Sequence, residues 1–528
     1  MPETPTAFTP ADAPAQKVHE LLLAAARVTP QAPAVIETAE DGTPVVLTYR
    51  GLEELAGACA DGLDRLGLDI GDRVVVEADN SGPAIAMYLA CSMLGLTFVP
   101  VSPDTPDQRL LTILELSGAA LHTRAAEAPR GCLPEALATA RFGPAGLTAE
   151  RAPEPRTRHR RTVVTTDTAY MIFTSGTTGR PKGVVMSHRG VLAFYRGLLA
   201  HRIVTSADRV ATTSPLQFDF SLLDIGLALA SGAAVVPVPR ALLPWPRRFL
   251  GHLAATRATQ VDGVPSIWRG ALRHEPDRLA ELTHIRGTLF SGEAFPIAEL
   301  RELRKLLPGI RVVNCFGATE SMASSLTDVP DPIPDDLERL SIGFAFEGAE
   351  MLLIDEDGRP VEEDGVVGEI HLRSPSLFSG YWNDPEATAA ALVRDPVDPR
   401  TGQLVFRSRD LAYRGPSGEL FFVGRTDSQV KIRGNRIELG EVERALRGCP
   451  GVAEAAVLVL SRPGQEDVLG AFVAPEPGAE AIEAGVRAHL RATLPSYMVP
   501  GELRQLPTLP VTHNGKTDRA ALAALAGA

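Results

Sequence analysis

The sequence has 528 residues, of which 45% are hydrophobic and 22% are charged, and this balance excludes disordered and fibrous proteins. At roughly 150 residues per domain, the length leaves room for about three folding units. Lys and Arg total 52 against 65 Asp and Glu, and the net charge of -13 excludes the broad basic surface that a nucleic-acid partner requires.

The chain carries no sequence signal for secretion or for a membrane. Residues 1–16 lack a basic start followed by an apolar core, so no secretory signal is predicted. The longest apolar stretch, residues 225–238, contains Ser231 and Gly232 and is too short to span a bilayer. The five cysteines form no CxxC pair, which predicts free thiols in a reducing cytoplasm and no zinc site.

Helices and strands alternate in the first hundred residues. Apolar spacing predicts a helix over residues 52–66, a strand over 73–77, a helix over 83–94 and a strand over 97–101. Further short apolar runs predict strands over residues 209–213, 235–238, 287–291 and 311–315. This alternation predicts an α/β fold with parallel or mixed sheets between layers of helices.

Two segments interrupt the pattern. Residues 124–167 are rich in Pro, Ala and Arg and are interpreted as a surface connection, with the arginines of 156–161 in solvent. Near residues 424–427, a glycine and charged residues precede a tail of about 100 residues. We therefore expect one domain over residues 1–426 and a smaller one over 427–528.

A strand followed by a loop of glycines and hydroxyls gives the strongest chemical signal. Residues 170–173 (YMIF) lead into residues 174–183 (TSGTTGRPKG). Glycines let backbone N–H groups converge on an anion, hydroxyls add donors and a lysine adds charge, so the loop suits phosphates better than a plain turn does. Pro181 precedes the lysine and no GK[ST] follows, so it is not a P-loop. The predicted phosphate ligands are Thr174, Ser175, Gly176, Thr177, Thr178, Gly179 and Lys182.

Seven further motifs follow this loop in a fixed order. They are residues 218–221 (FDFS), 314–320 (NCFGATE), 368–381 from GEI to GY, 409–411 (RDL), 424–434 (GRTDSQVKIRG), 494–500 (LPSYMVP) and 514–519 (NGKTDR). Over nearly its whole length the chain resembles the adenylate-forming enzymes, specifically the amino-acid adenylation domains of nonribosomal peptide synthesis and their stand-alone relatives. The resemblance implies a large N-terminal domain of layered sheets and helices and a small, mobile α+β C-terminal domain.

The resemblance also implies an ATP site. Phe316 would stack on adenine, Asp410 would accept hydrogen bonds from the ribose hydroxyls, and Arg425 would brace the ribose and phosphates. Thr319 would bind the α-phosphate, and Glu320 would hold the Mg²⁺ that accompanies ATP. The other nucleotide-binding residues that it implies are Gly292, Glu293, Ala294, Asn314 and Gly317. The alternative interpretation of Asp410 and Arg425 is an ion pair at the surface. The alternative for Glu320 is that it is a solvated carboxylate at the surface.

Lys516 is the predicted catalytic residue of the first half-reaction. A cation between the attacking carboxylate and the α-phosphate stabilises the charge that develops as pyrophosphate leaves. A lysine that seals the adenylate blocks a thiol, so the resemblance implies that the small domain rotates about Asp427 and presents residues 431–436 to the active site. The alternative to a hinge is that Asp427 lies in an ordinary turn.

The position of Asp219 implies an amino acid as the acid that is activated. A carboxylate in an apolar pocket is costly unless a cation such as an ammonium group pairs with it. By position, the rest of the pocket comprises Phe220, Leu223, Gly263, Leu289, Ser291, Cys315, Ala323 and Ser324. Phe220 and Leu223 fill volume, which favours alanine, glycine or serine and leaves stereochemistry and α- or β-amino position open.

The second substrate is expected to be a phosphopantetheine thiol on a separate carrier protein, because little chain follows Arg519. The resemblance extends to ligases of antibiotic biosynthesis, including those of macrolactam polyketide pathways, which we favour, and to D-alanine ligases of cell-wall modification. An acyl-CoA ligase and a degenerate nucleotide-binding scaffold remain alternatives. Arg409 stands where the family usually has glycine, which puts nucleotide affinity in doubt.

Overall fold

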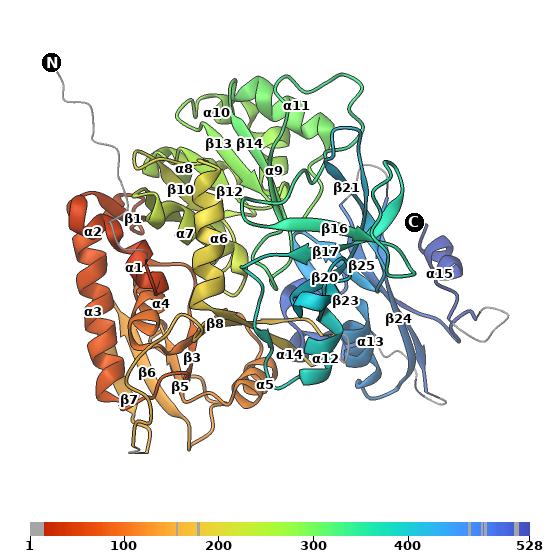
Figure 1. Ribbon diagram of the computed structural model, residues 1–528. Helices are drawn as coiled ribbons and strands as arrows, with labels where there is room; N and C mark the ends of the chain where they lie inside the picture. The colour runs from red at the N-terminus through yellow and green to blue at the C-terminus, as the bar shows by residue number, and fades with distance from the viewer. Residues whose placement is uncertain are drawn as a thin grey trace.

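The computed structural model describes residues 15–154, 157–176, 180–462, 466–476, 479, 483–511 and 517–527. In these ranges the chain forms two eight-stranded sheets, a five-stranded sheet, a two-stranded hairpin and a three-stranded sheet. The first three sheets belong to a large N-terminal domain, and the last two belong to a smaller C-terminal domain, coloured blue in Figure 1.

The first sheet has the order β15-β14-β13-β12-β10-β11-β1-β2. Its strands are β1 (Pro33–Thr38), β2 (Pro44–Thr48), β10 (Arg209–Thr212), β11 (Ala234–Pro237), β12 (Gln260–Asp262), β13 (Gly287–Phe290), β14 (Arg311–Phe316) and β15 (Ser325–Asp328). The six inner strands are parallel and the two edge strands are antiparallel. The carboxyl ends of β12, β13 and β14 therefore meet at one edge, which is where ligands bind in sheets of this type.

The second sheet has the order β18-β9-β8-β4-β3-β5-β6-β7. Its strands are β3 (Arg73–Glu77), β4 (Thr97–Val101), β5 (Leu121–Arg124), β6 (Ala138–Gly143), β7 (Gly146–Arg151), β8 (Thr168–Thr174), β9 (Lys182–Ser187) and β18 (Gly380–Tyr381). The third sheet contains β16 (Glu350–Ile354), β17 (Val367–Arg373), β19 (Leu392–Arg394), β20 (Leu404–Arg414) and β21 (Leu420–Arg425).

Helices cover the sheets of the large domain (Figure 1). They are α1 (Val18–Leu22), α2 (Ala24–Val28), α3 (Tyr49–Arg65), α4 (Gly82–Leu94), α5 (Asp107–Ser117), α6 (His188–Ala200), α7 (Asp219–Ala230), α8 (Pro246–Thr256), α9 (Ser266–His274), α10 (Pro276–Ala280), α11 (Ile297–Leu306) and α12 (Pro385–Ala391), with short 3-10 turns η1 (Arg240–Leu242) and η2 (Pro399–Thr401). Local chemistry sets their ends. The Ser81 hydroxyl accepts the Ala84 N–H at the start of α4, and Gly95, at φ 70, ends that helix.

The α/β prediction is confirmed, and two of its strands are correct to the residue. Strands β3 and β4 coincide with the predicted ranges 73–77 and 97–101. The interpretation of residues 124–167 as a surface connection is wrong in part, because β6 and β7 form a hairpin that extends the second sheet. The two strands of this hairpin contain Arg, Thr and Gly among few apolar residues, so the apolar signal of the hairpin is weak.

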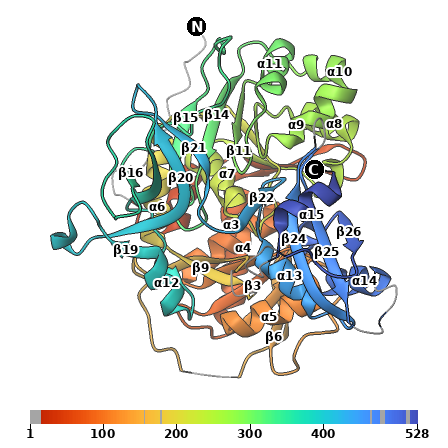
Figure 2. The same cartoon turned by 90° about the vertical axis from the view of Figure 1, so that its right-hand side faces the viewer.

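The C-terminal domain has a core of its own. It contains β22 (Gln429–Ile432), β23 (Asn435–Glu438), α13 (Leu439–Arg447), β24 (Val452–Leu460), β25 (Val468–Pro475), α14 (Glu483–Thr493), the 3-10 turn η3 (Ser496–Met498), β26 (Glu502–Gln505) and α15 (Arg519–Ala526). Figure 2 shows α13, α14 and α15 around the three-stranded sheet.

The β22–β23 hairpin packs against the large domain at its tip. Gly434 has a φ of 70, and a Cβ there would lie 2.1 Å from Cγ1 of Val264. A Cβ added to Gly292 would likewise lie only 3.0 Å from the Cα of Gly434. Only glycine allows this approach of the two backbones.

An ionic cluster joins the domains beside the hairpin tip. Glu466 accepts from Nη1 of Arg269, in α9, at 2.9 Å and from Nε of Arg433, in the hairpin turn, at 2.9 Å. Arg269 also donates to Glu299, in α11, at 2.8 Å. The cluster therefore holds the hairpin over the carboxyl edge of the first sheet.

Candidate functional site

A large cavity lies at the carboxyl ends of β13 and β14, between the two domains. Eight of the predicted site residues line it, although they are scattered from residue 292 to 425: Gly292, Glu293, Ala294, Asn314, Cys315, Phe316, Asp410 and Arg425. The predicted hinge, Asp427, also lines it, as do Lys431 and Arg433 of the C-terminal hairpin.

Phe316 presents one of the aromatic faces of this cavity. Its ring centroid is 5.6 Å from that of Phe422, and the Nζ of Lys431 lies 5.6 Å above the ring. The amide of Asn314 donates to Ser341 O at 2.9 Å, which fixes the strand behind it. A flat apolar face beside a cavity suits the stacking of a nucleobase.

Asp410 and Arg425 face each other on neighbouring strands. They are register partners in the β20–β21 pair, and Nη1 of Arg425 donates to Oδ1 of Asp410. Burial raises the pKa of Asp410, although the Arg425 charge opposes that shift. Arg425 also donates to Asp427 at 2.8 and 3.0 Å. A carboxylate at this place in the cavity can accept hydrogen bonds from ribose hydroxyls.

Arg409, which stands in place of the family's usual glycine, has a φ of 65. This is the left-handed region, which glycine enters without steric cost. The Arg409 N–H donates to Glu369 Oε1 at 3.1 Å, and its O accepts from Thr426 N at 3.0 Å. The side chain is 45% exposed, so the arginine extends toward solvent and does not fill the cavity.

The glycine-rich loop connects β8 to β9. Thr174 and Lys182 are register partners at its two ends, and Thr177, Thr178 and Gly179 lie outside the described residues. Ser175 donates to Arg436 O at 3.0 Å, and Gly176 N donates to Oε2 of Glu441 at 3.2 Å. Two of the predicted phosphate ligands, Ser175 and Gly176, are thus hydrogen-bonded to the C-terminal domain.

Glu320 is fully buried and holds two partners. Its Oε1 accepts from the Tyr381 hydroxyl at 2.7 Å, and its Oε2 accepts from Nη1 of Arg436 at 2.8 Å. Burial opposes ionisation, but Arg436 and Tyr381 outweigh it and lower the pKa of Glu320. The Nζ of Lys182 lies 5.2 Å above the Tyr381 ring. Thr319 precedes Glu320, and Lys516 lies outside the described residues.

The donor set around Glu320 fits a magnesium ion that is bound chiefly by a nucleotide. Within the described ranges, no group of three His, Cys, Asp or Glu side chains could hold a metal ion alone. Mg²⁺ is commonly held by one or two carboxylates together with substrate phosphates, and Glu320 supplies one ionised carboxylate. That carboxylate is shared with Arg436 in this structure, so metal binding requires Arg436 to move away.

Asp219 is the first residue of α7 and lies close enough to Cys315, a residue of the predicted amino-acid pocket, for their charges to interact. Burial, followed by the nearby Glu320 charge, raises the pKa of Asp219 to about 6. Two residues of the predicted pocket, Phe220 and Ser291, are partly exposed. The others are buried: Leu223, Gly263, Leu289, Cys315, Ala323 and Ser324. At Gly263 a Cβ would lie 2.1 Å from the Thr213 hydroxyl, so only glycine fits. At Gly317 a Cβ would lie 2.5 Å from Ala323 Cα.

Sequence reasoning missed residues that complete the site. Tyr381 lies inside a recognised motif, but no role was predicted for it. Arg436 was placed in the loop of residues 431–436, but its ion pair with Glu320 was not predicted. Arg109 and Glu441 were not recognised at all, because they are 332 residues apart and meet only through domain packing. The buried carboxyls Asp224 and Asp262, which flank the pocket residues Leu223 and Gly263, were also missed.

Comparisons with known proteins agree with this geometry. Residues 22–382 match the family model of the AMP-binding enzyme, and residues 441–516 match the AMP-binding enzyme C-terminal domain. The crystal structure of IdnL1 is similar over 95% of this chain and 100% of that chain, with 57% identity and a TM-score of 0.87. The crystal structure of CmiS6 is similar over 80% of this chain and 100% of that chain, with 57% identity and a TM-score of 0.76.

Two kinds of curated relative match. An L-proline--[L-prolyl-carrier protein] ligase of Pseudomonas fluorescens is 31% identical over 96% of this chain and 98% of its own length. Phosphinothricin tripeptide synthetase PhsC of Streptomyces viridochromogenes is 34% identical over 92% of this chain, and the match covers 43% of that protein. The chain spans less than half the length of such synthetases.

Among the described residues, no helix has both the length and the apolar character that crossing a membrane requires.

The matched family models together cover most of the sequence, and they extend across both domains that bound the cavity. The chain therefore belongs to the AMP-binding enzyme family.

Proposed function

We propose that the enzyme activates a small amino acid as an aminoacyl adenylate and transfers it to the phosphopantetheine thiol of a carrier protein. The observation that carries this proposal is the arrangement of Phe316 and Asp410 in one cavity, with Asp219 close enough to the cavity residues Cys315 and Lys431 to interact with their charges. Together they offer an aromatic face for a base, an acceptor for ribose and a carboxylate for an ammonium group.

The reaction has two steps. A carboxylate oxygen of the amino acid attacks the α-phosphorus of ATP, and the bond to pyrophosphate breaks. The carrier thiol then attacks the carbonyl carbon, and AMP leaves with the oxygen that came from the carboxylate. A Mg²⁺ ion held by Glu320 and the phosphates would neutralise phosphate charge. We assign Lys516 to the first step, where it stabilises the charge between carboxylate and α-phosphate, and Thr319 to contact with the α-phosphate.

The pocket favours a small substrate. Phe220 and Leu223 occupy volume, while Ser291, Cys315 and Ser324 offer small polar contacts. Cys315 and Ser291 face each other, and burial raises the pKa of the Cys315 thiol, so this side of the pocket carries no charge. Alanine, glycine or serine fits such a pocket, and D-alanine and small β-amino acids are the alternatives that Asp219 also allows.

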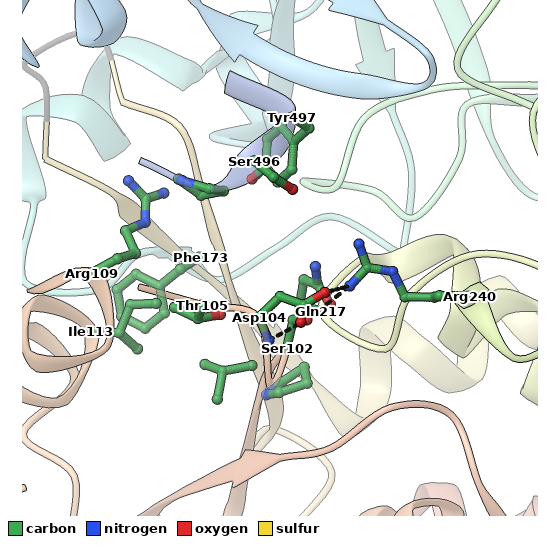
Figure 3. Close-up of a pocket in the computed structure, with 13 residues that line it drawn as sticks. Ser102, Asp104, Thr105, Arg109, Ile113, Phe173, Gln217, Arg240, Ser496 and Tyr497 are labelled. Carbon is green, nitrogen blue, oxygen red and sulfur yellow. Dashed lines mark hydrogen bonds and ion pairs between the residues drawn. The ribbon is translucent and has the colours of Figure 1, made fainter. Parts of the chain in front are cut away.

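A second cavity supports the arrival of a thiol from another protein. It lies between the domains, and the residues that line it include Ser102, Thr105, Arg240 and Tyr497. Arg109 also lines it and lies on the side opposite Arg240 in Figure 3. Tyr497 packs against Phe218, with 5.8 Å between ring centroids, and Phe218 adjoins Asp219. An extended thiol arm that enters here would reach toward the amino-acid site.

The segment that supplies Arg240 to this cavity is basic in a chain whose net charge is -13. Residues 239–274 contain one acid, the buried Asp262, and six arginines: Arg240, Arg247, Arg248, Arg257, Arg269 and Arg273. Trp245 is 60% exposed, and the Arg248 guanidinium lies 5.9 Å from its ring centroid. An acidic carrier protein with an anionic phosphopantetheine arm is complementary to such a face.

We further propose that the domain boundary lies at Asp427 and that the C-terminal domain, residues 427–528, rotates there between the two steps. The chain leaves the third sheet at Arg425 and enters the C-terminal hairpin at Gln429. Contacts of Arg436 with Glu320 and of Lys431 with Phe316 support an assignment of this structure to the transfer step, because they bring the C-terminal hairpin over the nucleotide cavity.

ATP–pyrophosphate exchange across the proteinogenic amino acids, their D-forms and small β-amino acids tests the proposal. We expect exchange with a small amino acid and a loss of several orders of magnitude in Lys516→Ala. Near-normal exchange in that variant would remove Lys516 from its assigned role. Thioester formation with a phosphopantetheinylated carrier, compared with coenzyme A, tests the second step; preference for coenzyme A would favour an acyl-CoA ligase.

A further inference from the structure

Two buried carboxyls lie behind the predicted amino-acid pocket. Asp224, in α7, and Asp262, the last residue of β12, are both 0% exposed. Thr212 of β10 is the register partner of Asp262 on the neighbouring parallel strand, and α7 packs against β10. Burial, followed by the Asp262 charge, raises the pKa of Asp224. The two carboxyls therefore lie close together between α7 and the first sheet.

Asp262 holds two residues of the predicted pocket. Its Oδ1 accepts from Leu289 N at 2.8 Å and from Nε2 of Gln260 at 2.7 Å. The next residue, Gly263, donates its N–H to Leu289 O at 3.1 Å. In a regular parallel ladder the Leu289 N–H would meet a backbone carbonyl, so the carboxylate takes the place of a ladder acceptor here. The Asp262 carboxylate therefore sets how the pocket wall stands at Gly263 and Leu289.

Four polar atoms in this space lack a hydrogen-bond partner among the described residues. They are Oδ1 and Oδ2 of Asp224, Oδ2 of Asp262 and Oγ1 of Thr212. Buried polar atoms are nearly always paired, and an unpaired buried carboxylate is an especially costly case. A single proton on Asp224 gives all four atoms a partner. Asp224 then donates to Oδ2 of Asp262, and its other oxygen accepts from the Thr212 hydroxyl.

The hydrogen-bond donors place this proton on Asp224. Burial raises the pKa of Asp262 as well, but the Leu289 N–H and the Gln260 amide oppose that rise and favour the ionised form. Asp224 has the Thr212 hydroxyl as its stabilising neighbour, and its pKa is raised further by the Asp262 charge. Asp262 is therefore the stronger acid of the two.

The other titratable groups near the pair also disfavour a second negative charge. Burial is the main cause of the raised pKa values of Tyr195, in α6, and of Cys315, in β14, and the Asp224 charge adds to both. The Asp208 charge adds to the raised pKa of Asp262. One negative charge and one proton are therefore the stable content of this space.

We propose that Asp224 and Asp262 share one proton, and that this hydrogen bond positions the wall of the amino-acid pocket at Gly263 and Leu289. Both carboxyls are positioning residues, because they act on the substrate through the pocket wall. The shared proton lets Asp262 keep its charge for the Leu289 N–H without a second carboxylate repelling it. The pocket then has a fixed width, which selects substrates by size. This inference rests on the proposed function, because it concerns the pocket for the amino acid.

The first test compares variants in ATP–pyrophosphate exchange. In Asp224→Asn an amide N–H replaces the shared proton and the amide oxygen still accepts from Thr212, so the KM for the amino acid should stay within about twofold of wild type. Asp224→Leu leaves Oδ2 of Asp262 unpaired, so this KM should rise roughly tenfold, while the KM for ATP changes little. Asp262→Asn moves the buried charge to Asp224, away from its donors, and should raise the KM for the amino acid more than Asp224→Asn does.

The same variants test the width of the pocket. The best exchange substrate is compared with its homologue that is longer by one methylene. Wild type and Asp224→Asn should discriminate equally, and Asp224→Leu should lose several-fold of the preference. Glu77→Gln is the matched control, because it removes a buried charge that His122 and Arg130 hold in the second sheet. It should lower the denaturation midpoint without changing the KM or the size preference.

The second test detects the proton without any substrate. Slightly above neutral pH, where Asp219 with its pKa of about 6 is ionised, the infrared spectrum of the wild type should contain a protonated-carboxyl band that Asp224→Asn lacks. Labelling aspartate with ¹³C should shift this band. The denaturation midpoint should be equal in sodium, potassium and choline buffers, because a proton and not a bound cation joins the carboxyls.

The outcomes separate this inference from the proposed function. A spectrum without that band, or a midpoint that rises with sodium or potassium, would overturn the shared proton. An unchanged KM and size preference in Asp224→Leu would overturn the positioning role, and Asp262→Asn carries the same comparison if Asp224→Leu does not fold. An enzyme that shows the band but exchanges with no amino acid would contradict the proposed function and support the shared proton.

Discussion

Single residues in this enzyme are placed by the sheets around them. Asp219 lies where α7 begins, and burial together with the Glu320 charge raises its pKa to about 6. Its role as partner of an ammonium group could be proposed from the sequence only through the order of motifs, because a lone aspartate is usually solvated. Its raised pKa depends on burial and on Glu320, which no spacing in the sequence indicates.

The pKa of Asp219 gives a prediction for pH dependence. Only the ionised carboxylate pairs with an ammonium group, so kcat/KM for the amino acid should rise with pH through about 6 and become level above it. Asp219→Asn should lower that kcat/KM roughly 10- to 100-fold and should remove the rise near pH 6. Exchange kinetics at fixed saturating ATP measure both effects, with the KM for ATP as the internal control. A pH profile that persists in the variant would assign the titration to another group.

Arg409 gives a prediction for stability. Its φ of 65 costs an L-residue about 1 kcal/mol or more, and this cost disappears in Arg409→Gly. Part of the gain is offset by the greater freedom of glycine in the unfolded chain, so we expect the free energy of unfolding to rise by up to about 1 kcal/mol. Arg409→Ala, which removes the side chain but keeps the left-handed Cβ, is the control and should show no gain. Denaturant unfolding measures the difference, and a less stable Gly variant would contradict the strain argument.

At the scale of elements, the β22–β23 hairpin connects the domains. Its turn residues Arg433 and Gly434 both have positive φ, which fits a tight two-residue turn. The sequence predicted that residues 431–436 face the active site, and the contacts of Lys431 and Arg436 agree with that expectation. The sequence could not indicate that Gly434 touches Val264, since this contact depends on the relative placement of two domains.

Gly434→Ala should therefore impair the transfer step selectively. The added Cβ would meet Val264 Cγ1 at 2.1 Å, so the hairpin can no longer seat on the large domain. We expect aminoacyl transfer to a carrier to fall roughly tenfold or more, with a much smaller change in ATP–pyrophosphate exchange. Gly418→Ala is the matched control, because Gly418 also has a positive φ, of 88, but its nearest contact is Phe344 Cε1 at 3.7 Å in the same domain. Equal losses in both half-reactions would show a general folding defect.

At the scale of the whole molecule, the layered α/β fold followed from short apolar strands that alternate with amphipathic helices. Strands β3, β4, β10 and β13 were predictable because buried parallel strands are continuous apolar runs. The β6–β7 hairpin was not, because it lies at a sheet edge and carries polar residues. Motif order predicted the nucleotide residues, whereas the Arg109–Glu441 pair depends on domain packing and could not be predicted from the sequence.

The central claim is that the enzyme joins an amino-acid carboxylate to AMP before it passes the acyl group to a thiol. The most direct measurement supplies the best exchange substrate with both carboxylate oxygens labelled with ¹⁸O, together with ATP, Mg²⁺ and a phosphopantetheinylated carrier. Because the thiol attacks the carbonyl carbon and AMP retains the bridging oxygen, mass spectrometry should find AMP with one ¹⁸O and an aminoacylated carrier. Formation of ADP with ¹⁸O in inorganic phosphate, or unlabelled AMP, would contradict the account.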